Sequence, residues 1–276
     1  MPQLGLGLRA NVSGISFYDG DAAAYFTRAG VTDATAKAQI NAFVKGIKDL
    51  GLYNNMLCWP LRSSQNAGTG ATAYSLGGLQ TANATLVNGS TWAANGTPFT
   101  TTQYANATIS DPGQDLTLLL AAAGSGANFS AFPHLFGVQN PNFYYNGEIF
   151  IGEPAGSASN VGTLVVNSSG YQPTTGIVSG LSGSTSFRFL SASSKPNTIL
   201  NIKRLDISSE ASGTPISSGT VTLTRMQLNG RWQGSVDLAQ PITCAFCAII
   251  APNISGSESS IYTLYKTTIG TGLGLP

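Results

Sequence analysis

The sequence predicts a mainly β protein: an antiparallel sandwich with a small helical element near its N-terminus and a short helix near its C-terminus. Charged residues make up only 9% of the 276 residues while hydrophobic residues reach 42%, so the chain can bury a sizeable core. Short apolar runs recur along most of the chain, separated by loops rich in Gly, Ser and Asn. Strong helical periodicity is confined to one segment near the N-terminus.

Two helices are expected between residues 19 and 52. Asp21 can cap a helix over 22–28 that ends at Gly30, and Thr32 or Asp33 can cap a second helix that Gly51 closes. In the second helix apolar residues recur at spacings of three and four, which is typical of an amphipathic helix. They are Ala36, Ile40, Phe43, Val44, Ile47 and Leu50. This stripe must pack on something, most simply on the domain that follows.

Strands are expected from about residue 72 onward. The run D-L-T-L-L-L-A-A at 115–122 is dense in apolar residues. The segment 143–152 alternates and contains an Asn146-Gly147 pair, a favoured hairpin turn. Further strands are predicted at 161–166, 185–190, 198–208, 220–228 and 245–251. Such short strands with turn-rich connections favour an antiparallel sandwich.

The segment N-A-T-L-V-N-G-S-T-W at 83–92 predicts two strand pieces around an Asn88-Gly89 turn. Trp92 is expected to be a core residue, as is Trp59. The segment also contains N-x-S/T triplets, but a chain this rich in Asn, Ser and Thr produces them by chance. Because no signal peptide is recognised at the N-terminus, we do not expect glycosylation.

The three cysteines, Cys58, Cys244 and Cys247, are too few for a disulfide scaffold. Cys244 and Cys247 form a C-x-x-C pair, but residues three apart in a strand point to opposite faces. A zinc site needs about four ligands, and the other soft candidates are Cys58 and the sole histidine, His134. We therefore expect buried apolar cysteines, no metal and no cofactor.

Several segments resemble the opening of laminin-G-like, concanavalin-A-like jelly-roll domains. They are C-W-P-L-R-S-S-Q-N-A-G-T-G-A-T-A-Y-S-L-G-G-L at 58–79 and T-L-V-N-G-S-T-W at 85–92. Gly96 and Phe99 supply the G-x-x-F strand that follows in that family. The resemblance implies a concanavalin-A-like jelly-roll sandwich.

The flanks resemble bacteriophage virion proteins that carry such a domain. The helical segment 21–51 is similar to the element that precedes the sandwich there, and 254–276 is similar to its end, where a strand is followed by a short helix. Ser257 or Ser255 can cap this helix, expected over 257–265. The resemblance covers about residues 21–276, and we expect three parts: an N-terminal docking segment (1–18), a helical element (19–57) and the jelly-roll domain (58–276).

The same fold hosts glycosidases, which need two carboxylates about 5–10 Å apart across the glycosidic bond. Retaining members carry them at alternate positions of one strand, whereas Glu148 and Glu153 have odd spacing, which predicts opposite faces. His134 lies in an apolar setting, and no G-x-S-x-G motif is present. The 12 acidic residues are scattered, unlike the clustered oxygen ligands of a calcium site. We predict that the protein is not an enzyme.

Aromatic residues give the candidate binding surface. Tyr144 and Tyr145 lie in N-P-N-F-Y-Y-N-G at 140–147, and because consecutive strand residues point in opposite directions, one ring is expected to face outward. Trp232 follows a predicted turn in N-G-R-W-Q-G. Sugar rings stack on such aromatics while Asn and Gln hold their polar edges. The alternative is that these rings fill the core or a subunit contact.

The leading functional hypothesis is a non-enzymatic phage virion protein, a head decoration, fibre or tail component located in the virion. The net charge of +1 without a basic stripe excludes a nucleic-acid footprint, and no run is long enough for membrane insertion. Low surface charge favours an assembly, here a homo-oligomer in contact with other virion proteins.

The alternation of Leu4, Leu6 and Leu8 can add a strand to a neighbouring subunit, or it can form a terminal strand of its own sandwich. Two alternative functions stay open. One is a lectin-like module that recognises host cell-surface glycans, and the less favoured one is a polysaccharide-degrading glycosidase on the same fold.

Overall fold

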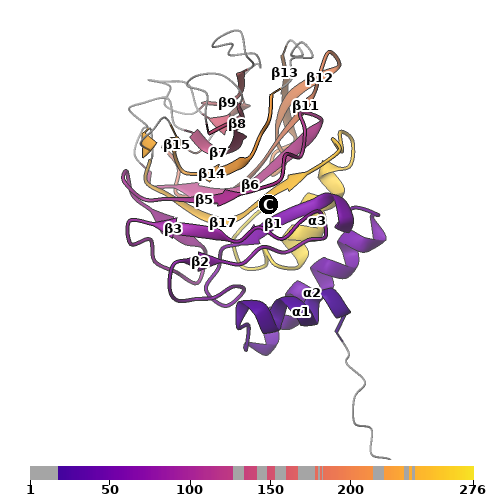
Figure 1. Ribbon diagram of the computed structural model, residues 1–276, viewed down its shortest axis with the longest axis vertical. Coiled ribbons are helices and arrows are strands. Elements are labelled where there is room, and N and C mark those ends of the chain that lie inside the picture. Colours follow the sequence, from indigo (N-terminus) through magenta and orange to yellow (C-terminus); the bar gives the residue numbers. More distant parts are fainter. Residues whose placement is uncertain are drawn as a thin grey trace, which may run out of the picture.

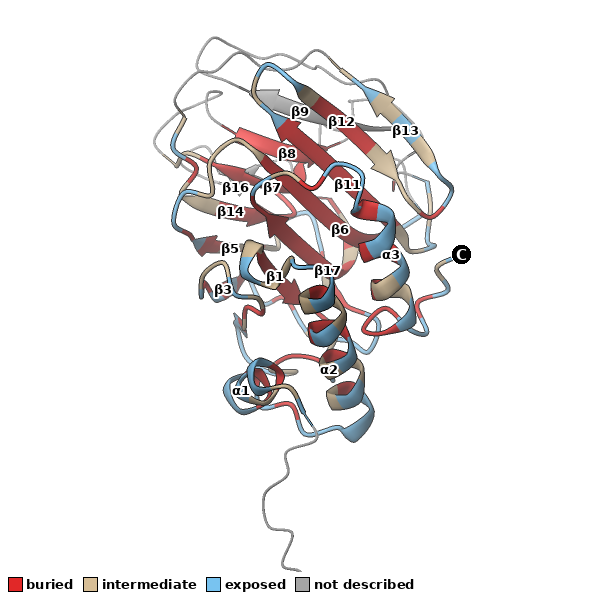
Figure 2. Ribbon diagram, turned by 90° about the vertical axis from the view of Figure 1, so that its right-hand side faces the viewer, coloured by how far each residue is buried: buried red, intermediate tan, exposed pale blue. Residues whose placement is uncertain are grey.

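Two antiparallel sheets stack face to face, and helices cover the outer face of one of them (Figure 1; Figure 2). This computed structural model describes residues 18–126, 134–141, 148–152, 160–166, 178–179, 181, 183–213, 221–232, 236–237 and 240–276. The predicted mainly β sandwich with helices near both ends of the chain is confirmed, and its strand pairing is compatible with a jelly roll.

The first sheet has seven strands in the described part of the chain, in the order β1-β17-β6-β11-β12-β13, with β4 also paired to β17. Its strands are β1 (Met56–Pro60), β4 (Thr97–Phe99), β6 (Leu116–Gly124), β11 (Arg188–Lys195), β12 (Ile199–Arg204), β13 (Ser209–Ser212) and β17 (Ile242–Ile250). Helices α2 (Ala34–Asp49) and α3 (Glu258–Thr267) lie in front of this sheet in Figure 2, and α1 (Gly20–Ala29) lies below it beside α2. A short 3-10 turn, η1 (Tyr53–Asn55), leads into β1.

The second sheet has eight described strands in the order β10-β9-β8-β7-β14-β5-β3-β2. They are β2 (Thr72–Ala73), β3 (Ala84–Val87), β5 (Tyr104–Thr108), β7 (His134–Gln139), β8 (Glu148–Gly152), β9 (Asn160–Val166), β10 (Val178–Ser179) and β14 (Arg225–Leu228). A ribbon of β15 (Arg231–Trp232) and β16 (Val236–Asp237) follows β14.

The main core fills the space between the two sheets. Leu118 and Leu120 of β6 in one sheet, and Met226 of β14 and Ile151 of β8 in the other, are all buried in it. Trp59 is fully buried in this core, and its indole Nε1 donates to the carbonyl of Ala82 at 2.9 Å. Trp59 is therefore a core residue as predicted.

Trp92 is half-buried rather than a core residue. It packs against the edge of the main core, and its Nε1 donates to the carbonyl of Gly70 at 3.0 Å. The predicted Asn88-Gly89 turn is present, with φ of 60° and 75°. However, only β3 flanks it, because the chain then leaves this sheet and next pairs as β4 with β17 of the other one. The prediction of two strand pieces around the turn is wrong.

A second core joins the helices to the outer face of the seven-stranded sheet. Phe246 of β17 contacts Phe43 of α2 and Tyr265 of α3, with ring centroids 5.8 and 4.9 Å away. The predicted α2 stripe is buried here at Ala36, Ile40, Phe43, Val44 and Ile47. Leu50 is 40% exposed because it is already the C-cap, and Gly51, with φ of 72°, closes the helix as predicted.

Helix α1 is capped by Asp19 and not by the predicted Asp21. The Asp19 carboxylate accepts from the backbone N–H of Asp21 at 3.0 Å, while the Asp21 carboxylate instead pairs with Lys48 of α2. Lys48 also donates to Asp19 at 2.7 Å, and this hydrogen bond holds the pKa of Asp19 below its usual value. Asp33 caps α2, as expected.

The three cysteines are buried and free, but the C-x-x-C pair is not split between the two faces of its strand. A register shift between Cys244 and Phe246 marks a β-bulge, so that Cys244 and Cys247 both face the main core, whereas Cys58 lies in the second core. Burial raises the pKa of Cys58 and Cys247. Among the described residues, His, Cys, Asp and Glu side chains form no group of three or more suited to a metal ion.

No helix in the described ranges is long and apolar enough to cross a membrane.

Candidate functional site

The residues predicted to bind a ligand fall largely outside the described residues. Tyr144 and Tyr145 do so, as do Leu4, Leu6 and Leu8 of the predicted docking segment. The backbone of Trp232 lies in β15, paired with Val236 of β16, but its side chain is outside the description. The binding role of these aromatic residues and the docking role of the leucines stay predictions.

The described strands assemble a different candidate site on the outer face of the eight-stranded sheet. Side chains alternate along a strand, so the neighbours of the core residues Ala105, Val138 and Met226 point away from the core. We call this surface the polar face. Its members are Thr72, Thr85, Tyr104, Asn106, Thr108, His134, Gln139, Glu148, Phe150, Arg225 and Gln227.

The strand register aligns these side chains in two rows. In one row Arg225 of β14 lies opposite Gln139 of β7, and Gln139 lies opposite Glu148 of β8. In the other row Gln227 lies between Asn106 of β5 and Gly137 of β7. Directly opposed residues have Cβ atoms about 5 Å apart, so each row is a continuous line of neighbouring groups.

A glycine and an aromatic stack close one end of the polar face. A Cβ on Gly137 would overlap the Cβ of Phe150, so only glycine leaves room for this ring. Phe150 stacks on His134, with ring centroids 3.4 Å apart and an interplanar angle of 21°. His134 Nδ1 lies 3.5 Å from Glu148 Oε2, and both residues are buried. His134 is flanked by apolar residues in the sequence, but in the fold it also contacts a carboxylate from the next strand.

Burial varies across the polar face. His134, Gln139, Glu148 and Gln227 are buried, whereas Tyr104, Asn106 and Arg225 are half-buried and the three threonines are exposed. A solvent-accessible strip over β5 and Arg225 of β14 therefore adjoins a buried polar interior formed by Gln227 of β14 together with β7 and β8.

Gln227 is the most informative residue of this face. It is only 3% exposed, yet neither atom of its side-chain amide has a hydrogen-bond partner among the described residues. Leaving a buried polar atom unsatisfied costs about 1–3 kcal/mol, so such a residue calls for an explanation. A cavity of about 10 Å³ lies beside it, lined also by Gln139, Glu148 and Phe150. That volume is about the room taken by one water molecule or one hydroxyl group.

Arg225 is the only Lys or Arg among the members of the polar face. Burial lowers the pKa of Arg225, and the phenol of Tyr104 partly offsets this effect. Because an arginine pKa lies so far above neutrality, the guanidinium stays charged. The polar face therefore presents one partly desolvated cation beside the accessible strip.

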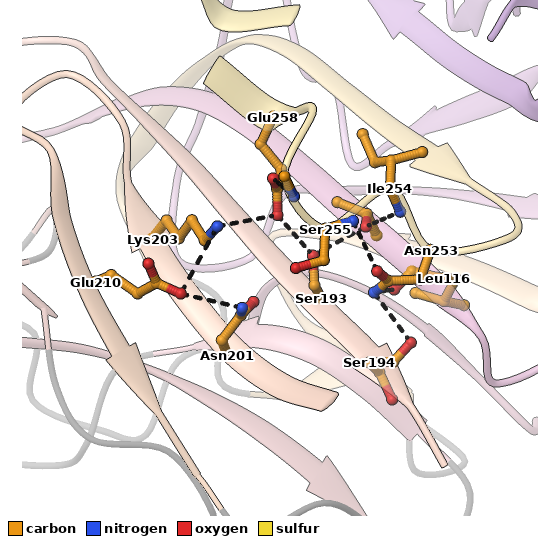
Figure 3. A network of polar contacts seen from close by, with 12 residues as sticks. Leu116, Ser193, Ser194, Asn201, Lys203, Glu210, Asn253, Ile254, Ser255 and Glu258 are labelled. Atoms are coloured by element: carbon orange, nitrogen blue, oxygen red, sulfur yellow. Dashed lines mark hydrogen bonds and ion pairs between the residues drawn. The ribbon is translucent and has the colours of Figure 1, made fainter. Parts of the chain in front are cut away.

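A second polar cluster lies under the start of α3, on the opposite side of the sandwich (Figure 3). Glu258 is 1% exposed and accepts from the hydroxyl of Ser193 at 3.2 Å and from the backbone N–H of Gly256 at 2.6 Å. Figure 3 shows Lys203 between two carboxylates, with its Nζ 3.5 Å from Glu258 Oε1 and 3.6 Å from Glu210 Oε1. Lys203 therefore occupies the space between the two carboxylates, where a glycosidase would hold the glycosidic bond of its substrate.

This cluster fixes the last helix to the sheet. Ser257 stands at the N-cap position as predicted, but its side chain makes no cap hydrogen bond, and the Glu258 carboxylate binds the backbone there instead. Ser193, which donates to Glu258, also bonds Thr117 of the neighbouring strand β6 at 2.9 Å. These contacts therefore stabilise the fold.

Glu153, the other carboxylate considered from the sequence, lies outside the described residues.

Comparison with solved structures places the architecture among known β-sandwich domains. A mutant of Trypanosoma rangeli sialidase displaying trans-sialidase activity aligns with a TM-score of 0.57 and 13% identity, over 85% of this chain and 40% of that chain. The same sialidase in complex with sialic acid gives 0.53 and 14%, over 85% and 40%. The botulinum neurotoxin serotype C1 binding domain gives 0.56 and 8%, over 77% and 52%.

The chain shares a β-sandwich fold with these proteins. It spans only 40–52% of their length, and at such low identity the likeness extends to the fold alone. No family model matches the chain, and no curated protein matches it in sequence. The polar face therefore has to be interpreted from its own residues.

Sequence reasoning passed over the polar face although part of its signal is visible. In the run T-R-M-Q-L, Arg225 and Gln227 alternate with Met226 and Leu228, as expected of a strand with one polar face. The other contributors come from separate strands, and only the register brings Asn106 and Gln139 beside them.

Proposed function

We propose that this chain is a non-enzymatic carbohydrate-binding module and that the polar face is its binding surface. The observation that carries the proposal is the buried, unpartnered amide of Gln227 beside a cavity with room for one hydroxyl. A sugar hydroxyl both donates and accepts, so a single hydroxyl can bond an amide that is otherwise left unsatisfied. Binding sites commonly combine a few such polar groups with apolar and aromatic walls.

The half-buried residues next to Gln227 supply the remaining contacts. Asn106 lies directly opposite Gln227 and offers a second amide, and Tyr104 precedes Asn106 by two positions on the same face of β5. A tyrosine ring presents an apolar surface for a sugar ring and a hydroxyl at its edge. The fold neighbours include a sialidase solved with sialic acid, which is compatible with a sugar ligand for this sandwich.

The described carboxylates support a binding role rather than hydrolysis. Most glycosidases use two carboxyl groups that face each other across the glycosidic bond. Here Glu148 lies against His134, and Glu210 and Glu258 share Lys203. Release of reducing sugar from a polysaccharide by the purified protein would contradict the non-enzymatic assignment.

A glycan array tests the proposal. We expect the wild-type chain to bind at least one glycan, and we expect Tyr104→Ala and Asn106→Ala to weaken that binding at least about tenfold, which corresponds to about 1.4 kcal/mol. Lys45→Ala is the control, because Lys45 is an exposed residue of α2 on the other side of the sandwich, and its binding should match the wild type.

The same array distinguishes the polar face from the aromatic residues proposed from the sequence. If Tyr144→Ala or Trp232→Ala abolishes binding while Tyr104→Ala and Asn106→Ala do not, the module binds glycans elsewhere and the assignment to the polar face is wrong. An array without any signal argues against a carbohydrate ligand altogether.

We propose further that the module is displayed on a phage virion as a homo-oligomer and contributes to attachment to host-surface glycans. The support is the resemblance of segments 21–51 and 254–276 to virion proteins. Residues 1–18, with Leu4, Leu6 and Leu8, would then dock on neighbouring virion proteins. Deletion of residues 1–14 is expected to reduce the number of copies per purified particle. Unchanged incorporation of the truncated chain would rule out this docking role.

A further inference from the structure

The row of the polar face that contains Gln227 runs from an open end to a closed end. Thr85 of β3 lies opposite Asn106 of β5, and Asn106 lies opposite Gln227 of β14. Gln227 in turn lies opposite Gly137 of β7, and Gly137 lies opposite Phe150 of β8. Thr85 is exposed, Asn106 is half-buried, and Gln227 and Phe150 are 3% and 1% exposed. A ligand that lies along this row therefore enters over β3 and β5, and Phe150 limits how far it reaches.

The closed end of the row is a slot over Gly137. Because Gly137 has no side chain, the Gln227 amide and the Phe150 ring are the side chains on its two sides, and all three residues line the cavity of about 10 Å³. Stacking on His134 holds the Phe150 ring in place. The slot has room for one hydroxyl group but not for a hydroxyl that carries a methyl or acetyl group. Gln227 offers this hydroxyl a donor and an acceptor that have no partner among the described residues.

The residues of this row carry no charge. The charged residues of the neighbouring row are already engaged within the chain, since Glu148 lies against His134 and Arg225 has an interaction of its own. A charged ligand group in the slot would lose its hydration without gaining an opposite charge, which is costly. The row therefore favours a neutral sugar.

We infer that the polar face binds the end of a neutral glycan chain, with an unsubstituted hydroxyl of the terminal residue in the slot between Gln227 and Phe150. The chain then continues outward over Asn106 and Thr85. Gln227 and Thr85 are two strand spacings apart, roughly 9.6 Å, which is comparable to the length of a disaccharide. This inference rests on the proposed carbohydrate-binding function and specifies its ligand class and binding mode. A site for the middle of a chain would have to be open at both ends of the row.

Chain length tests the binding mode with the wild-type protein. The probes are the cello-, manno- and galacto-oligosaccharide series from disaccharide to hexasaccharide, each titrated by calorimetry. In at least one series we expect the affinity to rise by no more than about twofold beyond the trisaccharide, because the row extends only two strand spacings outward from the slot. A chain bound along its middle would gain affinity with each added residue, since longer chains offer more overlapping binding positions.

Modified disaccharides test the slot. Each hydroxyl of the disaccharide from the tightest-binding series is removed or methylated in turn. Removal of one hydroxyl of the terminal residue should weaken binding at least about tenfold, because the Gln227 amide would then stay buried without a partner. Methylation of the same hydroxyl should weaken binding at least as much, because the added methyl group exceeds the volume of the slot.

Replacing Gln227 separates a binding role from a structural role. Gln227→Leu removes the unpartnered amide at similar side-chain volume, so the melting temperature should equal or exceed that of the wild type. The affinity should nevertheless fall at least about tenfold, and the variant should bind the disaccharide and its deoxy derivative equally. Gln39→Leu is the matched control, because it makes the same change on α2, on the other side of the sandwich, and both affinities should match the wild type.

The possible failures can be told apart. If affinity keeps rising up to the hexasaccharide, if no single hydroxyl is required, or if Gln227→Leu keeps wild-type affinity, the chain-end inference is overturned and the carbohydrate-binding function stands. If none of the three series binds, the inference is also overturned, and a blank glycan array overturns both. The chain-length and disaccharide titrations use the wild-type chain, so they decide the question even if Gln227→Leu does not fold.

Discussion

Replacing Glu258 with alanine is expected to lower the free energy of unfolding by about 3–5 kcal/mol, the usual cost of breaking a buried charge pair by removing one partner. The Glu258 carboxylate is 1% exposed and accepts from Ser193 and from the backbone of Gly256 at the start of α3. Its loss leaves these donors without their acceptor and leaves Lys203 with one carboxylate fewer. Chemical denaturation followed by circular dichroism measures the change.

Glu210→Ala is the matched control. Glu210 contacts the same Lys203 at nearly the same distance, but its side chain is 49% exposed. Exposed ion pairs are worth about 0–1 kcal/mol, and Glu210 also accepts one hydrogen bond from Asn201 at 3.2 Å, so this variant should lose clearly less stability than Glu258→Ala. Equally small losses in the two variants would mean that burial of Glu258 does not strengthen the cluster and that α3 is held by its apolar contacts alone.

Gly96→Ala is expected to destabilise the protein by about 2–5 kcal/mol, because backbone strain and overpacking act together. Gly96 has φ of 140°, and a Cβ there would lie 2.5 Å from the carbonyl oxygen of Cys244 and 2.9 Å from the backbone nitrogen of Ala245. These atoms belong to the bulge of β17, a central strand that cannot yield without disturbing its pairing with β6.

Gly89→Ala provides the comparison for Gly96→Ala. Gly89 also has a positive φ, 75°, but a Cβ there would meet nothing within 4 Å. Only the conformational cost of about 1–2 kcal/mol remains. Melting temperatures and denaturation midpoints of the two variants therefore separate close packing from strain. If Gly96→Ala were no worse than Gly89→Ala, the tight approach of this segment to β17 would be wrong.

The sequence predicted elements correctly where the structure depends on residues close together in the chain. The periodic stripe of α2 and the glycines at its end and in the Asn88-Gly89 turn led to correct elements, because helix periodicity and positive φ depend on near neighbours. The choice of Asp21 as the cap of α1 failed because Asp19, two residues earlier, is equally able to cap, and the local sequence does not distinguish between the two residues.

Features that depend on pairing between distant strands were not accessible from the sequence. The bulge in β17 turned Cys244 and Cys247 to the same face, against the simple alternation rule. The chain crossed to the other sheet after Gly89, which left Trp92 half-buried. The polar face required the register of β5 against β14 and of β14 against β7, so Gln227 and its neighbours could not be grouped beforehand.

The most direct test of the central claim, that the polar face binds carbohydrate, is an NMR titration that follows side-chain amide signals. We expect a mixture of acidic and neutral oligosaccharides to shift the amide resonances of Asn106 and Gln227. The amides of Asn253, beneath α3, and Asn55, beside β1, should not move, because both lie on the other side of the sandwich. Shifts confined to Asn253 and Asn55, or no shifts at all, would contradict the account.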